Sequence, residues 1–217
     1  MHPIDSTDTT RTIVVPGTGR VLVEPDIATL RLGVLVVRQT AGAARESTAV
    51  LMTAVLEALG AKGVAKRDLR TALLSLSPVT DYSSDTGPRV TGYQAANSVS
   101  VTVRDLALAG TLIDAALGAG ATSLDGLDFT VADPSAAEDE ARKAALADAR
   151  RRATTIAAAA GVKLGAVVGV SEGGDAGPPP YPMPRAMAFK AEAADTPVEA
   201  GSQEITVSVS VAFAIDK

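Results

Sequence analysis

The amino-acid sequence predicts an α+β fold, in which an antiparallel-rich β-sheet is flanked by three α-helices. Apolar and small polar residues alternate over several segments, which is typical of strands with one buried face. Three other segments carry their apolar residues at helical spacing. Each strand segment keeps a polar face, whereas buried parallel strands read as continuous apolar runs, so we expect mainly antiparallel pairing.

The predicted strands are spread over the whole chain. The clearest is at residues 205–215, where every second residue is apolar and the residues between them are Thr, Ser or Ala. The same alternation predicts six further strands, at residues 12–23 (with a bend at Pro16-Gly17), 28–37, 71–79, 97–104, 124–131 and 164–171.

The first two helices are predicted from apolar residues that recur every three or four positions. Residues 41–59 form the first, and Gly60 is expected to be the residue that ends it. Residues 106–117 form a shorter helix that would stop at Gly118 or Gly120. The apolar face of the first helix consists of Ala44, Thr48, Leu51, Val55 and Leu59.

The third helix is predicted by its end signals, its charges and a stripe of small residues. Asp133 and Pro134 supply an N-cap and a first-turn proline, and Gly161 would end the helix after about 40 Å. Oppositely charged residues four positions apart would support it, at Glu138–Arg142, Asp139–Lys143 and Asp148–Arg152. The stripe, which allows close approach to a sheet or to another helix, consists of Ala137, Ala141, Ala145, Ala149 and Ala153, followed by Ile156 and Ala160.

The sequence predicts a disordered leader at residues 1–11 and a single domain at residues 12–217. A Pro/Gly-rich loop at residues 173–184 would carry the chain into the final strand. The segment from Ala28 to Arg104 has the order βαββ, and the arrangement after it allows a degenerate repeat of this unit.

The sequence contains neither a run of about 20 apolar residues, as a membrane helix needs, nor the apolar region of a signal peptide. We therefore expect no transmembrane segment, and a cytoplasmic protein if Met1 is the native start. The alternative is the periplasm or cell envelope, if a signal peptide was removed.

Composition excludes several classes of function. Twenty basic residues against 25 acidic ones give a net charge of −5, whereas nucleic-acid binding needs a clustered excess of Lys and Arg. The lack of Cys removes thiolate catalysis and Cys-based metal sites, and the one His, His2, lies in the leader. We therefore predict no catalytic residues, no cofactor-binding residues, no metal site and no nucleic-acid partner.

Two glycine- or oxygen-rich motifs have a structural explanation. The stretch from Pro16 to Arg20 lacks the third glycine and the following helix of a phosphate loop, so we expect a turn or bulge between two strand segments. Residues 81–85 are rich in oxygen ligands but lack EF-hand spacing, which predicts an exposed hairpin loop.

The other candidate residues also have a structural explanation. The three arginines at 150–152 are surrounded by acids, which predicts a solvated, ion-paired face. Residues 178–181 match a PPxY peptide motif, but a stiff connecting loop is the simpler interpretation. Asp26 and Asp114 are isolated acids with no His, Cys or paired carboxylate to form a catalytic group.

A set of short motifs, in their order and spacing, resembles the SIMPL-domain family from residue 12 to residue 215. The most distinctive block is Gly92-Tyr93-Gln94-Ala95-Ala96-Asn97-Ser98-Val99-Ser100-Val101, followed by Arg104-Asp105-Leu106. At Ala200, family members often have Pro. The resemblance implies no established catalytic residues. It also implies a periplasmic or envelope location for many relatives, and a link to immunogenicity or oxidative stress for some.

We expect a non-enzymatic scaffold or binding protein that self-assembles into a homo-oligomer and can bind a protein partner. The alanine stripe favours a long partner helix or sheet, and the long final strand would have an edge that must be paired or covered. The alternatives are a carboxylate-dependent hydrolase and a peptide-binding module that uses the Pro-rich loop.

Overall fold

The computed structural model describes residues 11–83, 87–173, 196 and 198–216. Within these residues the chain forms seven strands and three α-helices, and every strand pair is antiparallel. The α+β class and the antiparallel pairing are therefore confirmed. The strands are shared between two sheets, a division that the periodicity did not indicate, and the chain divides into two compact units, each with its own hydrophobic core.

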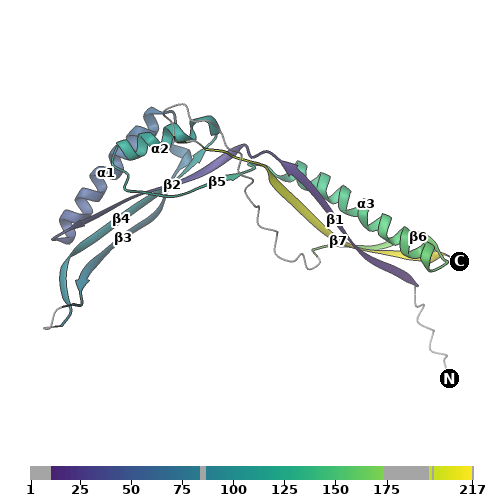
Figure 1. The fold of residues 1–217 in the computed structure, drawn as a ribbon. Helices are drawn as coiled ribbons and strands as arrows, with labels where there is room; N and C mark the ends of the chain where they lie inside the picture. Colours follow the sequence, from purple (N-terminus) through teal and green to yellow (C-terminus); the bar gives the residue numbers. More distant parts are fainter. Residues whose placement is uncertain (1–10, 84–86, 174–195, 197, 217) are drawn as a thin grey trace, which may run out of the picture. The chain divides into compact units, whose positions relative to one another are not determined.

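The first unit is a three-stranded sheet with one long helix along it (Figure 1). The sheet has the order β1-β7-β6, and α3 packs on β1 and β7. Its elements are β1 (Thr12–Val23), α3 (Ser135–Ala159), β6 (Lys163–Glu172) and β7 (Gln203–Asp216). Its core consists of the small residues of α3 and the inward face of the sheet, including Ile13, Val15, Val207, Val209, Val211 and Phe213.

The second unit is a four-stranded sheet of order β3-β4-β2-β5, with two helices on one face (Figure 1). Its elements are β2 (Ile27–Arg38), α1 (Ala41–Ala61), β3 (Leu69–Asp81), β4 (Arg89–Val103), α2 (Ala109–Gly118) and β5 (Ser123–Thr130). Larger side chains fill its core, among them Leu30, Leu32, Val34, Met52, Val55, Leu59, Val99, Val101, Leu112 and Ile113.

The inward and outward faces of the predicted strands are confirmed where alternation was strict. The apolar residues of β7 face α3, while the Ser and Thr residues between them are less buried. The expected open edge of this strand is wrong, because β7 is the middle strand of its sheet and pairs with β1 and β6. The single domain at residues 12–217 stays a prediction, which an unfolding experiment tests by showing whether both cores unfold together. The degenerate repeat stays a prediction as well.

The end of α3 is confirmed, and its start lies one residue later than predicted. Pro134 is the N-cap, because its carbonyl accepts the first helical hydrogen bond, from the Glu138 N–H at 2.9 Å, and Ser135 is the first helical residue. Asp133, which was expected as the N-cap, lies just before it, and its carboxylate accepts a hydrogen bond from the Ser135 N–H at 3.1 Å. At the other end, Gly161 adopts φ +69°, the left-handed conformation that favours glycine after a helix.

Three details of the predicted helices are wrong. The alanine stripe keeps its four-residue spacing to the buried Ala157, which leaves Ile156 and Ala160 exposed. In α1, Gly60 lies inside the helix, because the chain continues to Ala61 and first turns left-handed at Gly63. The segment expected as one helix at residues 106–117 begins with a 3₁₀ turn at Leu106–Leu108 before α2.

The charge pairs of α3 are confirmed in part. Glu138–Arg142 and Asp148–Arg152 form at 3.1 and 2.8 Å. The pair Asp139–Lys143 is wrong, because each residue prefers a neighbour three positions away: Asp139 pairs with Arg142 at 2.8 Å and Lys143 with Glu140 at 2.7 Å. Arg142 also reaches Glu172 on β6 at 3.0 Å, which ties the helix to the edge of its sheet.

Candidate binding surfaces

The alanine stripe of α3 is buried within the first unit. Its five buried members lie in the core that α3 forms with β1 and β7, and glycines of β1 leave room there for the helix backbone. A Cβ atom added at Gly17 would overlap the carbonyl oxygen of Ala145, and one added at Gly19 would overlap that of Ala141. The stripe therefore packs on the sheet of its own unit and is not free for a neighbouring molecule.

The same contact explains the glycine motif of β1. The expected bend, turn or bulge at residues 16–20 is wrong, since β1 pairs with β7 from Thr12 to Val23 without a shift of register. Gly17 and Gly19 are needed for close approach of a helix and not for a turn. The alternating Gly-x-Gly in a strand, together with the four-residue alanine spacing in α3, was the signal that could have linked the two segments.

The two most enclosed carboxylates are held by arginines. Arg104 donates to Asp68 at 2.7 Å, and this bond lowers the pKa of Asp68 although burial opposes the shift. Burial raises the pKa of Asp148, but the Thr18 N–H, at 3.2 Å, and the adjacent Arg151 and Arg152 outweigh it, so its pKa lies below its ordinary value. In these arrangements both carboxylates serve as fixed anions that hold elements together.

The remaining acids that the sequence singled out bind neighbouring chain segments. Asp26 accepts a hydrogen bond from the Ala132 N–H at 2.7 Å, and Asp114 accepts one from the Thr196 hydroxyl at 2.9 Å. Asp81 lies at the exposed end of β3 and accepts from the Ser83 N–H and hydroxyl, which lowers its pKa. The structure does not bring these three acids to one site.

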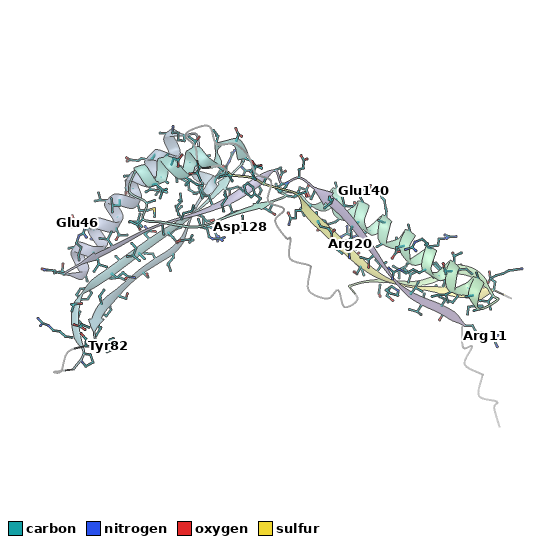
Figure 2. All side chains as sticks on the ribbon, viewed as in Figure 1. Arg11, Arg20, Glu46, Tyr82, Asp128 and Glu140 are labelled. Atoms are coloured by element: carbon teal, nitrogen blue, oxygen red, sulfur yellow. The ribbon has the colours of Figure 1, made fainter. Side chains whose placement is uncertain are left out.

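The hairpin and loop predictions have different outcomes. Tyr82 is exposed at the tip of the β3–β4 hairpin, as predicted for the described part of residues 81–85 (Figure 2). Residues 178–181, all of the Pro/Gly-rich loop but its first residue, and residues 1–10 of the leader lie outside the described residues. Arg151 and Arg152 are ion-paired with Asp148, as predicted for that face of α3.

The most open feature of the second unit is its edge strand β3. It pairs with β4 alone among the described strands, and α1 lies over β4 and β2 and only marginally over β3. Leu73, Leu74 and Leu76 are consequently 53, 73 and 49% exposed. Leu73 and Leu74 are consecutive residues in a regularly paired stretch, so their side chains project to opposite faces of the strand.

A groove lies between α1 and this uncovered part of the sheet. It has a volume of about 420 Å³ and is lined by Arg45, Thr48, Ala49, Leu74, Ser75, Leu76, Ala95 and Asn97. The Thr48 hydroxyl fixes the floor by donating to the Ala44 carbonyl at 2.9 Å and lying 3.3 Å from the Ala95 carbonyl. The helix and β4 are therefore held together at the base of the groove.

The first unit has a smaller counterpart beside its edge strand β6. Val167, Val168 and Val170 are about half exposed there. A groove of about 330 Å³ lies between this strand and α3, lined by Leu146, Ala147, Arg150, Val167, Val170, Val211 and Phe213. In both units a helix thus covers two strands of the sheet and leaves an apolar edge strand beside it.

Sequence reasoning missed both edge surfaces. The predicted strand at residues 71–79 was read as having one buried face, yet its burial is low along nearly its whole length. The Leu73-Leu74 pair was the signal that could have revealed this low burial. Two consecutive leucines break strict alternation and cannot share one buried face.

In the described part of the chain, no helix is both long and apolar enough to cross a membrane. Among the same residues, His, Cys, Asp and Glu side chains form no group of three or more that could hold a metal ion.

Comparison with known proteins places these features in context. The family described as "SIMPL: Protein of unknown function (DUF541)" matches residues 13–213. The 26 kDa periplasmic immunogenic protein of Brucella melitensis is 38% identical over 94% of this chain and 84% of its own length. The uncharacterized protein YggE of Escherichia coli K12 is 36% identical over 73% of this chain and 64% of its own.

Proposed function

The chain belongs to the SIMPL family, and from that premise we propose that it is a non-catalytic, self-assembling binding protein whose association surface is the open edge of β3. The observation that carries this proposal is the exposure of three leucines along a 13-residue edge strand. Such an edge offers unpaired backbone N–H and C=O groups to another strand, and proteins normally cover it or protect it.

The central part of β3 has few of the usual protective features. Between Arg70 and Asp81 the strand contains no charged residue. Its pairing with β4 is regular from Leu73 to Val79, and Pro78 is the one residue in that stretch without an N–H. A strand from a second copy, or from a protein partner, could pair with the regular apolar edge at Leu73–Ser77.

The edges of the first unit are better protected. β6 changes register twice in its middle, between Leu164 and Val167 and again between Val167 and Gly169. Such bulges twist an edge away from further pairing. On the other side of the sheet, β1 carries Pro16 and Arg20, the latter 3.7 Å from Glu204. The two register shifts of β3, at Thr71/Leu73 and Val79/Thr80, lie on either side of its regular stretch. These differences favour β3 as the association edge.

We further propose a periplasmic or envelope location, supported by the Brucella relatives, whose printed names state that they are periplasmic. This alternative is favoured over the cytoplasmic one. A link to stress responses stays part of the same proposal.

The rival function is a carboxylate-dependent hydrolase. Because Asp68 and Asp148 are engaged by arginines, neither is well suited as a general base. A broad panel of hydrolase substrates tests this rival. Turnover that is lost when one acid is replaced by its amide would overturn the non-catalytic proposal.

The association surface is tested by two matched substitutions, Leu73→Lys on β3 and Val168→Lys on β6. Both positions are 53% exposed, so the two variants should fold equally well. We expect light scattering to show a multi-chain mass for the wild type and for Val168→Lys, and a lower mass for Leu73→Lys, because a lysine on the edge opposes strand pairing.

Two results would contradict the proposal. A wild-type mass of one chain at micromolar concentration would remove self-assembly and leave a binding module only. An unchanged mass for Leu73→Lys, with dissociation of Val168→Lys, would place the association edge in the first unit instead.

A further inference from the structure

The groove beside α1 has the size and lining of a small-molecule site. Its volume of about 420 Å³ lies within the range of ligand pockets, about 300–1,000 Å³. Leu74, Leu76, Ala49 and Ala95 form its apolar walls, and four polar residues complete the lining: Arg45, Thr48, Ser75 and Asn97. This combination is typical of sites that bury an apolar body and fix its orientation with a small number of polar contacts.

The walls formed by α1 and β4 offer few hydrogen bonds to a ligand, and the free backbone groups of β3 point away from β4, along the outer edge of the sheet. β4 pairs with β3 on one side and β2 on the other, so its backbone groups are already used. The Thr48 hydroxyl is engaged by the carbonyl groups of Ala44 and Ala95. A peptide backbone in the groove would carry polar groups that need partners, whereas an alkyl chain needs none.

One cation at the rim has no partner among the residues that the structure describes. Arg45 makes no hydrogen bond or ion pair with any side chain in the described residues. Glu46 follows it on α1 (Figure 2), but adjacent helix residues do not face each other. The positions three and four residues away from Arg45 are Ala41, Gly42, Thr48 and Ala49, none of which is acidic.

This unpaired guanidinium gives the groove its charge preference. Arginine binds a carboxylate through two parallel N–H···O bonds, a geometry that a lone ammonium group cannot match. The Asn97 side chain, also without a partner among the described residues, lines the same groove and can donate a further bond.

We propose that the groove between α1 and β3 binds a linear aliphatic carboxylate. Its alkyl chain lies against Leu74 and Leu76, and its carboxylate bonds to Arg45. The groove and the association edge share β3, because Leu74 and Leu76 line the groove. Leu73, which tests association, does not line it, so the two proposals are tested by different substitutions.

The probes are decanoate and the uncharged 1-decanol, titrated into the full chain by calorimetry below their aggregation concentrations. We expect decanoate to bind saturably and 1-decanol to bind more weakly. Arg45→Gln should weaken decanoate binding by about tenfold or more while leaving 1-decanol unchanged, because only the carboxylate uses the guanidinium.

Two more variants separate the groove from general surface effects. Ala49→Phe adds a ring to an exposed wall position and should weaken both probes, because the groove is partly filled. Arg150→Gln removes the corresponding cation beside the β6 groove and should leave both titrations unchanged. Circular dichroism melting checks that each variant is folded.

Three outcomes would overturn the proposal. One is the absence of saturable decanoate binding by the folded wild type. The second is weakening by Arg150→Gln in place of Arg45→Gln. The third is displacement of decanoate by a short acetylated apolar peptide with a free C-terminal carboxylate at lower concentration than decanoate itself requires, which would make the ligand a peptide terminus. Each of these results can occur whatever mass light scattering gives, so failure here is distinguishable from failure of self-assembly.

Discussion

The two units solve the same packing problem with different side chains. In the first, α3 presents alanines to the glycines of β1, so backbones approach closely. In the second, α1 presents Met52, Val55 and Leu59 to the valines and leucines of β2 and β4. The first arrangement gains many close backbone contacts with little side-chain area, and the second gains mainly from buried apolar area.

This difference determines which substitutions each unit tolerates. A close helix–sheet contact has no room for added atoms, whereas a core of large side chains is most sensitive to their removal. Hydrogen exchange measured separately for peptides of each unit can tell whether damage stays in the unit that was changed.

The largest effect is expected for Ala145→Glu. The position is fully buried against β1, so a glutamate would force a charge into a contact that has no space or partner for it. We expect a loss of about 4 kcal/mol or more, enough to unfold the first unit. Exchange should rise throughout α3, β1 and β7.

The control for this substitution is Ala144→Glu, one position earlier on the exposed side of α3. It should change stability by less than about 0.5 kcal/mol. If Ala145→Glu remained folded but lost oligomeric mass, the stripe would face a neighbouring chain, and the packing described for the first unit would be wrong.

In the second unit, Leu59→Ala should have the next largest effect. Leu59 is fully buried in the core beneath α1. Removing its side-chain atoms leaves a cavity, with an expected cost of about 2–5 kcal/mol. Urea unfolding gives the size of the loss, and exchange should show it mainly in α1, β2 and β4. Protection lost first in α3 would mean that the units share one core.

A single methyl group should have opposite effects in the two units. In Gly19→Ala the new Cβ would overlap the Ala141 carbonyl, so we expect a loss of about 1–3 kcal/mol. In Gly60→Ala the new Cβ would meet nothing within 4 Å inside α1, so we expect a gain of about 0.5–1 kcal/mol from helix propensity. Thermal unfolding of both variants gives the signs, and two equal shifts would contradict the close contact.

The smallest effect concerns acid pH. The pKa values of Asp148 in the first unit and Asp68 in the second are both lowered in the folded chain, by the contacts described above. Each ionised carboxylate therefore contributes stability above its unfolded pKa of about 3.9, and that contribution is lost as the pH falls through the lower folded value.

Asp148→Asn and Asp68→Asn test this pH dependence. Each variant should be less stable than the wild type near neutral pH, and the difference should shrink as the pH falls below about 4. Urea unfolding at several pH values measures it. A difference that stays constant into acid would show that the hydrogen-bond geometry, and not the charge, supplies the stability.

Local sequence patterns predicted the elements well but not their partners. The strict alternation of residues 205–215 fixed the inward face of β7, and Asp133, Pro134 and Gly161 marked the ends of α3. Pairing is a long-range property, so neither the association of β1 with β7 nor the division into two sheets could be read from periodicity. Gly17 and Gly19 were misread for this reason, because their function depends on a helix more than a hundred residues later.

The candidate surfaces were harder to predict than the core. Leu74 and Leu76 look like core residues in the sequence, and only the position of α1 over β2 and β4 leaves them exposed. Arg45 carries no local signal at all, because its lack of a partner among the described residues depends on what surrounds it in the folded chain.

The position of β7 in the chain also determines the order in which the two sheets can be completed during synthesis. Every strand of the second unit lies between residues 27 and 130, so its sheet can be completed while later residues are still being translated. β1 leaves the ribosome first, yet both β1 and β6 have β7 as their strand partner. A nascent chain that stops before residue 203 would therefore carry a finished second sheet and a first unit with two unpaired strands, a form that chaperones and proteases can recognise.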